Sequence, residues 1–93
     1  MKIIVEWDQT KANINQRKHS VTFKEAATVF NDPLSFTISD PLHSYQEERF
    51  IILGVSIKRR LLVVVHTDHD DRIRIISARL ANNHERKTYE DGY

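Results

Sequence analysis

This 93-residue sequence contains no cysteine, so no thiolate is available as a nucleophile or metal ligand. The side chains considered first for chemistry are its arginines, lysines and histidines. Residues 72–79 read Arg-Ile-Arg-Ile-Ile-Ser-Ala-Arg, and a period of two places Ser77 and Arg79 on one face of a strand. Such a strand delivers a hydroxyl and a guanidinium to the edge of its sheet, where a guanidinium can hold a phosphate through two hydrogen bonds. The alternative is that Arg79 forms a salt bridge that anchors this strand to the C-terminal segment, since arginines are commoner as structural partners than as catalysts.

The five histidines do not show the spacing of a known metal site, and this holds for His19, His43, His66, His69 and His84 alike. His66 and His69 flank a turn rich in aspartate, but turns favour aspartate for reasons of backbone geometry. Two glycines in the whole chain exclude the usual glycine-rich phosphate loop. We therefore expect neither a metal ion nor a cofactor.

What remains is a set of side chains that can bind phosphate or move protons, namely Lys11, Lys18, His19, Arg49, Arg79 and Tyr89. Cleavage of RNA without a metal needs a base for the 2′-hydroxyl, an acid for the 5′-oxygen and cations that stabilise the phosphorane. The set contains candidates for each of these roles.

The elements that must position these residues can be predicted from periodicity and caps. Residues 2–7 read as a strand, and Asp8 is a good N-cap for a helix that reaches about residue 18. Thr22 and Glu25 have the spacing of a capping box and begin a second helix, which residues 31–33 end. Strands are predicted over residues 34–39, 48–57, 61–67 and 72–79, and a last helix from a cap at Asn82 to about residue 91.

This order predicts a single α+β domain over residues 1–93, of the form β-α-α-β-β-β(-β)-α, with a mainly antiparallel sheet. The helical hairpin is expected to pack on one sheet face. The residues expected to meet there are Leu61, Val63, Val65, Ile73 and Ile75 from the strands and Phe23, Ala27 and Phe30 from the second helix.

Composition is that of an ordinary globular protein, with 40% hydrophobic and 29% charged residues. The net charge of +1 is too small to indicate a nucleic-acid-binding protein by itself. No apolar run approaches the length of a membrane span, and the N-terminus lacks the apolar core of a signal peptide. We expect a cytoplasmic protein that does not contact a membrane.

The spaced string Trp7-Asp8-x-x-Lys11-x-x-x-Asn15-x-x-Lys18-His19-x-Val21-x-Phe23-x-Glu25-Ala26 resembles the opening of the BrnT family of bacterial toxins. The resemblance continues through Phe30-x-Asp32-Pro33, Glu48-Arg49 before Gly54, and residues 73–79 with Glu85 and Tyr89, so that it covers about residues 5 to 90. It implies a compact RelE-like fold and a ribonuclease that stops translation. It also implies a cognate antitoxin with a ribbon-helix-helix DNA-binding part (BrnA-like), so that DNA is reached only through the antitoxin.

The resemblance also suggests roles for single residues. We expect Lys18 and His19 to contact phosphate and transfer protons, and Arg49 and Arg79 to stabilise the phosphorane. The expected RNA-binding residues are Lys11, Asn15, Arg74 and Tyr89. For Asn15 the alternative is a hydrogen bond to backbone across the helical hairpin, and Trp7 is expected to pack between strand and helix.

One position departs from the family pattern. Family members tend to carry an arginine two residues after the threonine that ends the central strand, and this chain has His69 there. Either His69 replaces the arginine as a proton-transfer group, or the protein is a weakened toxin. Two other functions stay open: a non-catalytic subunit that binds an antitoxin and acts as a corepressor, and an unrelated RNA-binding domain that uses Arg72, Arg74 and Arg79.

Overall fold

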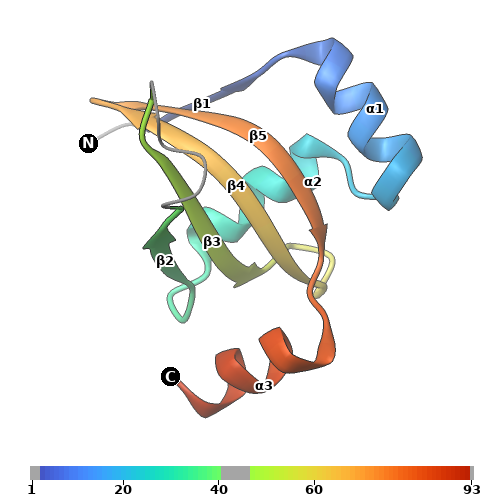
Figure 1. Ribbon diagram of the computed structural model, residues 1–93, viewed down its shortest axis with the longest axis vertical. Helices are drawn as coiled ribbons and strands as arrows, with labels where there is room; N and C mark the ends of the chain where they lie inside the picture. Colours follow the sequence, from blue (N-terminus) through green and yellow to red (C-terminus); the bar gives the residue numbers. More distant parts are fainter. Residues whose placement is uncertain (1–2, 41–46, 93) are drawn as a thin grey trace.

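The computed structural model describes residues 3–40 and 47–92 and has the predicted α+β architecture (Figure 1). Its elements are β1 (Ile4–Trp7), α1 (Gln9–His19), α2 (Phe23–Ala27), the 3₁₀ turn η1 (Thr28–Asn31), β2 (Phe36–Ser39), β3 (Arg49–Val55), β4 (Leu61–His69), β5 (Arg72–Leu80) and α3 (Asn83–Asp91). The strand order is β1-β5-β4-β3-β2. β1 runs parallel to β5, and the other neighbours are antiparallel. None of the helices described is long and apolar enough to cross a membrane.

The predicted helix caps are formed, with one difference. Asp8 accepts a hydrogen bond from the Lys11 amide, and Thr22 accepts one from the amide of Glu25. At α3 both halves of the capping box between Asn82 and Glu85 are present. At α2 the Glu25 side chain instead accepts hydrogen bonds from Ser56 and Arg60, because a buried carboxylate is stabilised best by a charged partner.

The main core lies between the sheet and the pair α1–α2. Its buried members are Ala12, Val21, Phe23, Ala26, Val29, Ile52, Leu62, Val64, Ile75 and Ala78, with Val5, Trp7, Ala27 and Phe30 partly buried against them. The indole of Trp7 meets the ring of Phe23 edge-on, with the centroids 6.2 Å apart. Trp7 therefore packs between strand and helix, as predicted.

The prediction that Leu61, Val63, Val65, Ile73 and Ile75 share one face is wrong, because Ile73 and Ile75 lie on the face opposite the three β4 residues. Ile75 belongs to the core under the helices, whereas Leu61 and Val63 pack on the other face, against Tyr89 of α3. A β-bulge in β5 is the physical reason. Val65 pairs with Ser77 and the next residue, His66, pairs with Ile75, so Ile76 has no residue opposite it on β4. The alternation therefore reverses within β5, which a period of two cannot anticipate.

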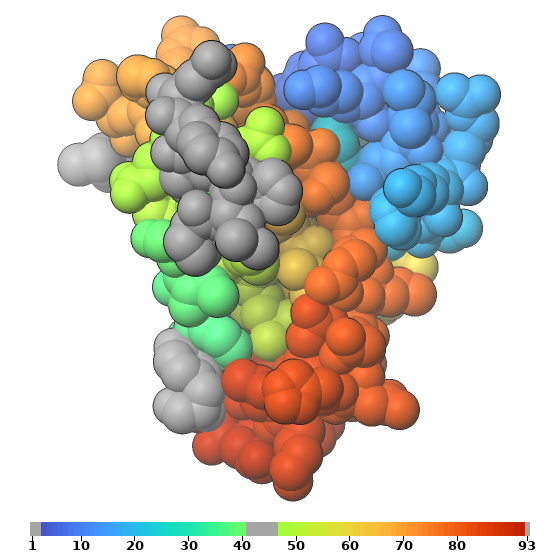
Figure 2. Space-filling view, in the orientation of Figure 1, coloured from blue at the N-terminus to red at the C-terminus, as the bar shows by residue number. Residues whose placement is uncertain are grey.

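We call the sheet face opposite α1 and α2 the open face; it carries Leu53, Val63, Thr67, Arg74 and Arg79. Thr67 follows Val63 by an even number of residues on β4, and Arg74 lies directly opposite Thr67. In Figure 2 this face is toward the viewer, and α3 (red) covers its lower end. The β4–β5 hairpin and α3 lie at opposite ends of the sheet in Figure 1.

Candidate functional site

A row of polar side chains crosses the open face at the end away from α3. Glu6 lies opposite Arg74, Arg74 opposite Thr67, and Thr67 opposite Arg49, on β1, β5, β4 and β3 in turn. Directly opposite residues in a sheet present their side chains to the same face. The sheet register therefore brings two arginines to either side of Thr67.

A cleft of about 210 Å³ adjoins this row, lined by Glu6, Glu47, Thr67, His69, Arg72 and Arg74. Two ion pairs line it: Arg72 Nη1 lies 2.8 Å from Glu6 Oε1, and Arg74 Nη2 lies 2.9 Å from Glu47 Oε2. The four side chains of these pairs are 36–59% exposed, so a ligand in solvent can reach them. The cleft offers guanidinium groups for an anion, and carboxylates and an imidazole for proton transfer.

Three of the predicted site residues belong to this region: His69 and Arg74 line the cleft, and Arg49 stands in the adjoining row. Three further residues of this region, Glu6, Glu47 and Thr67, are not predicted as site residues by the sequence. Alternation along the first strand does set Glu6 apart from its neighbours Val5 and Trp7. Only the parallel register of β1 on β5 brings that carboxylate to the arginines.

Arg79 and Tyr89 lie at the other end of the open face, where they hold α3. The Arg79 guanidinium donates two hydrogen bonds to the Glu85 carboxylate, at 2.8 and 2.7 Å. This ion pair raises the pKa of Arg79 and lowers the pKa of Glu85. It is the salt bridge considered above as the alternative to a phosphate-binding role, and both prongs of the guanidinium are engaged in it.

The Tyr89 hydroxyl donates a hydrogen bond to the Asp32 carboxylate at 2.6 Å. Burial, and then this bond to a carboxylate, raise the pKa of Tyr89 to about 12. Since the phenol stays protonated at neutral pH, it cannot serve as a base there. Its contact ties the C-terminal helix to the residues that follow η1.

Asn15 binds backbone groups, which is the structural role predicted as the alternative to RNA binding. It is buried, and its side-chain amide donates to the carbonyl oxygens of Val21 at 3.0 Å and Ala78 at 2.8 Å. Its carbonyl oxygen accepts from the Ala78 amide at 3.1 Å. No group of the side chain is left to donate to RNA, so we remove Asn15 from the RNA-binding set.

The other predicted residues lie on α1. Lys11 and Lys18 are exposed and His19 is half-buried, and Lys18 and His19 fall in the last turn, where cations are favoured by the helix dipole. No hydrogen bond among the described residues joins His19 to Arg79. His43 lies outside the described residues. Within residues 3–40 and 47–92, no three side chains of metal-ligating type gather into a site.

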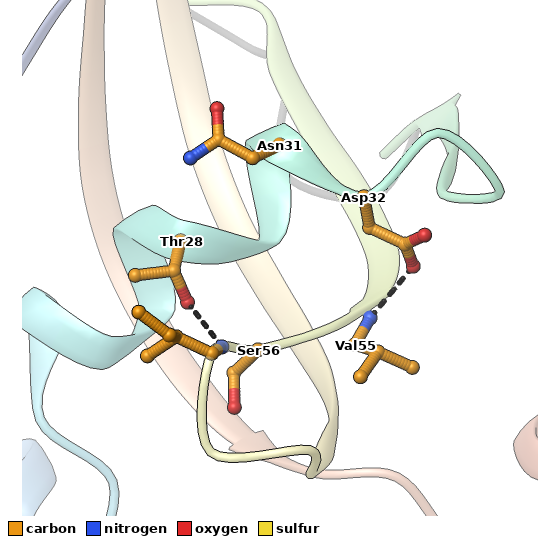
Figure 3. Close-up of a pocket in the computed structure, with 6 residues that line it drawn as sticks. Thr28, Asn31, Asp32, Val55 and Ser56 are labelled. Atoms are coloured by element: carbon orange, nitrogen blue, oxygen red, sulfur yellow. Dashed lines mark hydrogen bonds between the residues drawn. The ribbon is translucent and has the colours of Figure 1, made fainter.

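A second cavity, of about 330 Å³, lies beside η1 (Figure 3). Two of its polar side chains bind backbone: Thr28 Oγ1 accepts a hydrogen bond from the Ile57 amide and Asp32 accepts one from the Val55 amide, both at 2.8 Å. They tie the end of β3 to η1. Their contacts are those of a structural connection.

A family model described as the ribonuclease toxin BrnT of type II toxin–antitoxin systems matches residues 7–85. The crystal structure of the Brucella abortus ribonuclease toxin BrnT, solved at 1.1 Å, is similar with a TM-score of 0.61 and 22% sequence identity, over 89% of this chain and 99% of that one. At this identity the likeness establishes the fold alone, and no curated protein matches the chain. Because the family model spans most of the sequence, the chain belongs to the BrnT family of ribonuclease toxins of type II toxin–antitoxin systems.

Proposed function

We propose that this toxin cleaves RNA at the cleft on the open face without a metal ion, and that this cleavage inhibits translation in the cytoplasm. The observation that carries the proposal is the placement of Arg49 and Arg74 on either side of Thr67, with His69 lining the adjoining cleft. Two guanidinium groups can hold the scissile phosphate and stabilise the charge that develops on it. An imidazole in the same cleft supplies proton transfer.

Lys11, Lys18 and His19 of α1 are proposed to contact the RNA backbone outside the cleft. α1 is fastened to β5 through the hydrogen bonds between Asn15 and Ala78. Exposed cations on a fixed helix can bind phosphates of any sequence, and such contacts weaken as salt concentration rises.

The test is RNA cleavage by the purified toxin in the presence of EDTA. We expect cleavage to persist in EDTA and to leave a 2′,3′-cyclic phosphate and a 5′-hydroxyl. Arg74→Ala should lower the rate by about 10²–10³, the usual effect of losing one electrostatic stabiliser of a transition state. Lys24→Ala is the matched control, because Lys24 is an exposed cation on α2, under the other face of the sheet. An Mg²⁺-dependent activity, or a fully active Arg74→Ala variant, would refute the proposal.

Membership of a type II toxin–antitoxin family implies a cognate protein antitoxin. We propose that this antitoxin contains a ribbon-helix-helix part that binds DNA, so that the toxin reaches DNA only through it. We also propose that it neutralises the toxin by covering the open face. A mainly apolar groove opens on that face and suits protein side chains better than nucleotides; it is lined by Phe36, Ile38, Ile51, Leu53 and Val63 and by Glu85 and Thr88 of α3.

A second function is favoured by one specific observation. Both Arg72 and Arg74 already have carboxylate partners, which lower the positive charge available to RNA. Neutralised arginines of this kind are expected in a catalytically weak toxin that binds its antitoxin and acts as a corepressor. Such a protein would leave RNA intact in the assay above and would tighten the antitoxin's binding to DNA.

A further inference from the structure

The cleft contains two carboxylates to which the proposed function gives no role. Glu6 is bound to Arg72, and Glu47 is bound to Arg74. We propose that Glu47 is the general base of the cleavage reaction and His69 the general acid. This assignment rests on the proposed function and goes beyond it by naming the two proton carriers.

The antiparallel register brings Glu47 and His69 to the same place. Arg49 lies opposite Thr67; Glu47 precedes Arg49 by two residues, and His69 follows Thr67 by two. Both side chains line the cleft. They therefore stand at the same end of the open face, although they are far apart in the sequence.

Glu47 is better placed than Glu6 to serve a phosphate in the row. A phosphate held between Arg49 and Arg74 lies beside the guanidinium that already binds the Glu47 carboxylate at 2.9 Å. Glu6 also lies opposite Arg74, but its carboxylate binds Arg72, which is opposite His69 and lies beyond the row. The titratable and charged side chains that line the cleft together with Glu47 are Glu6, His69, Arg72 and Arg74.

The reaction balances with these two groups. The Glu47 carboxylate takes the proton of the ribose 2′-hydroxyl, and the 2′-oxygen forms a bond to phosphorus. The bond from phosphorus to the 5′-oxygen breaks, its electron pair stays on that oxygen, and protonated His69 supplies the proton. The products are a 2′,3′-cyclic phosphate and a 5′-hydroxyl, and solvent then restores the two protonation states.

The assignment predicts different losses for the two residues. Glu47→Gln keeps the size of the side chain but cannot accept the proton, so kcat should fall by about 10²–10⁴ while KM changes little. The acid limb of the pH–rate profile should disappear in this variant, and the alkaline limb should disappear in His69→Ala. Glu90→Gln is the matched control, because Glu90 is an exposed carboxylate on α3, at the end of the sheet away from the cleft, and this variant should keep both limbs.

An RNA with a 5′-bridging sulfur at the scissile bond separates acid from base, because a thiolate leaves without needing a proton. It should restore cleavage by His69→Ala and leave Glu47→Gln slow, with melting temperatures showing that both variants are folded. Rescue of Glu47→Gln in place of His69→Ala, or a fully active Glu47→Gln, overturns the assignment while the proposed function stands. A folded wild-type protein that leaves RNA intact in EDTA overturns both.

Discussion

Arginines of the same chemical type have different roles on this sheet, and their neighbours decide the roles. Arg74 stands over a cleft beside a half-exposed carboxylate, whereas Arg79 is held by both prongs to Glu85 at the start of α3. The Glu85 carboxylate also accepts a hydrogen bond from the backbone amide of Asn82. Arg79 therefore helps to hold α3 in place against the sheet.

Arg79→Ala should destabilise the protein without specific loss of catalysis. The pair is partly exposed and screened by solvent, so we expect a cost of about 1 kcal/mol and a melting temperature lower by roughly 4–8 °C. Arg79→Lys should recover part of this, because an ammonium cannot make the two-pronged contact. Cleavage and melting measured on the same samples should show activity in proportion to the folded fraction. A stable Arg79→Ala protein without activity would return the residue to the active site.

His66 makes stability depend on pH. It is buried between the rings of Phe30 and Phe50, and its Nε2 has no hydrogen-bond partner among the described residues. Burial lowers the pKa of His66, and Asp68, which lies 2.8 Å from Nδ1, offsets this only in part. The folded state therefore favours the neutral ring, and the unfolded chain binds the proton more readily.

This difference in proton binding means that the free energy of unfolding should fall as the pH is lowered. The contribution of His66 is fully present above the ordinary imidazole pKa near 6.5 and is lost as pH falls from there toward the lowered pKa, with a slope of at most about 1.4 kcal/mol per pH unit. Urea unfolding between pH 7.5 and 5.5 measures it, well above the range in which Glu25, Asp32 and Glu85 lose their contributions. In His66→Gln this slope should be absent. An unchanged slope would assign the dependence to other groups.

At the scale of elements, α1 completes the edge of β5 where β1 has ended. β1 pairs with β5 only as far as Ile75, and Ala78 further along has both backbone groups bound by the Asn15 amide. A side-chain amide has one donor and one acceptor side, as a peptide group has, so it can take the place of a neighbouring strand. This contact fixes α1, and with it Lys18, relative to β5.

Asn15→Ala should therefore loosen α1. The buried amide and carbonyl of Ala78 and the carbonyl of Val21 would lose their partner, at about 1–3 kcal/mol for each unsatisfied group. We expect a clear fall in melting temperature and faster hydrogen exchange at the Ala78 amide. Asn13→Ala, at an exposed position on the same helix, should change neither. Protection of the Ala78 amide in Asn15→Ala would contradict this role.

At the scale of the whole molecule, the sheet has a hydrophobic core on each of its faces. The helices α1 and α2 cover one face, and α3 covers only one end of the other. Leu53, Leu61 and Val63 form the smaller core beneath α3. The apolar groove borders this core and α3, and the cleft lies at the other end of the open face.

Val63→Asp should unfold the protein through the smaller core. Val63 is 6% exposed, and an unpaired buried carboxylate costs several kcal/mol, against a total stability of about 5–15 kcal/mol for a domain. Circular dichroism should show loss of the cooperative transition. Ile57→Asp, at a residue that is 77% exposed, should fold normally. A cooperatively folded Val63→Asp would mean that α3 and its core contribute little.

Much of the architecture was determined by the sequence, because caps and periodicity are local. Asp8, Thr22 and Asn82 place the helix starts by accepting hydrogen bonds from amides that a new helix leaves free. The strands and the last helix lie where alternation and the capping box predicted them, with ends shifted by a few residues. The family could also be read from spaced residues, because such a pattern needs no contact information.

The tertiary structure decided which side chains meet. The bulge in β5 moved Ile75 to the face opposite Val63, and only strand register brought Glu47 and Glu6 to the arginines. From the sequence, Arg79 could be either a phosphate ligand or a salt-bridge partner. The position of α3 brings Glu85 to it, and Arg79 forms the salt bridge. Pairing across a sheet joins residues distant in sequence, so the partners of a charged side chain cannot be read from its neighbours along the chain.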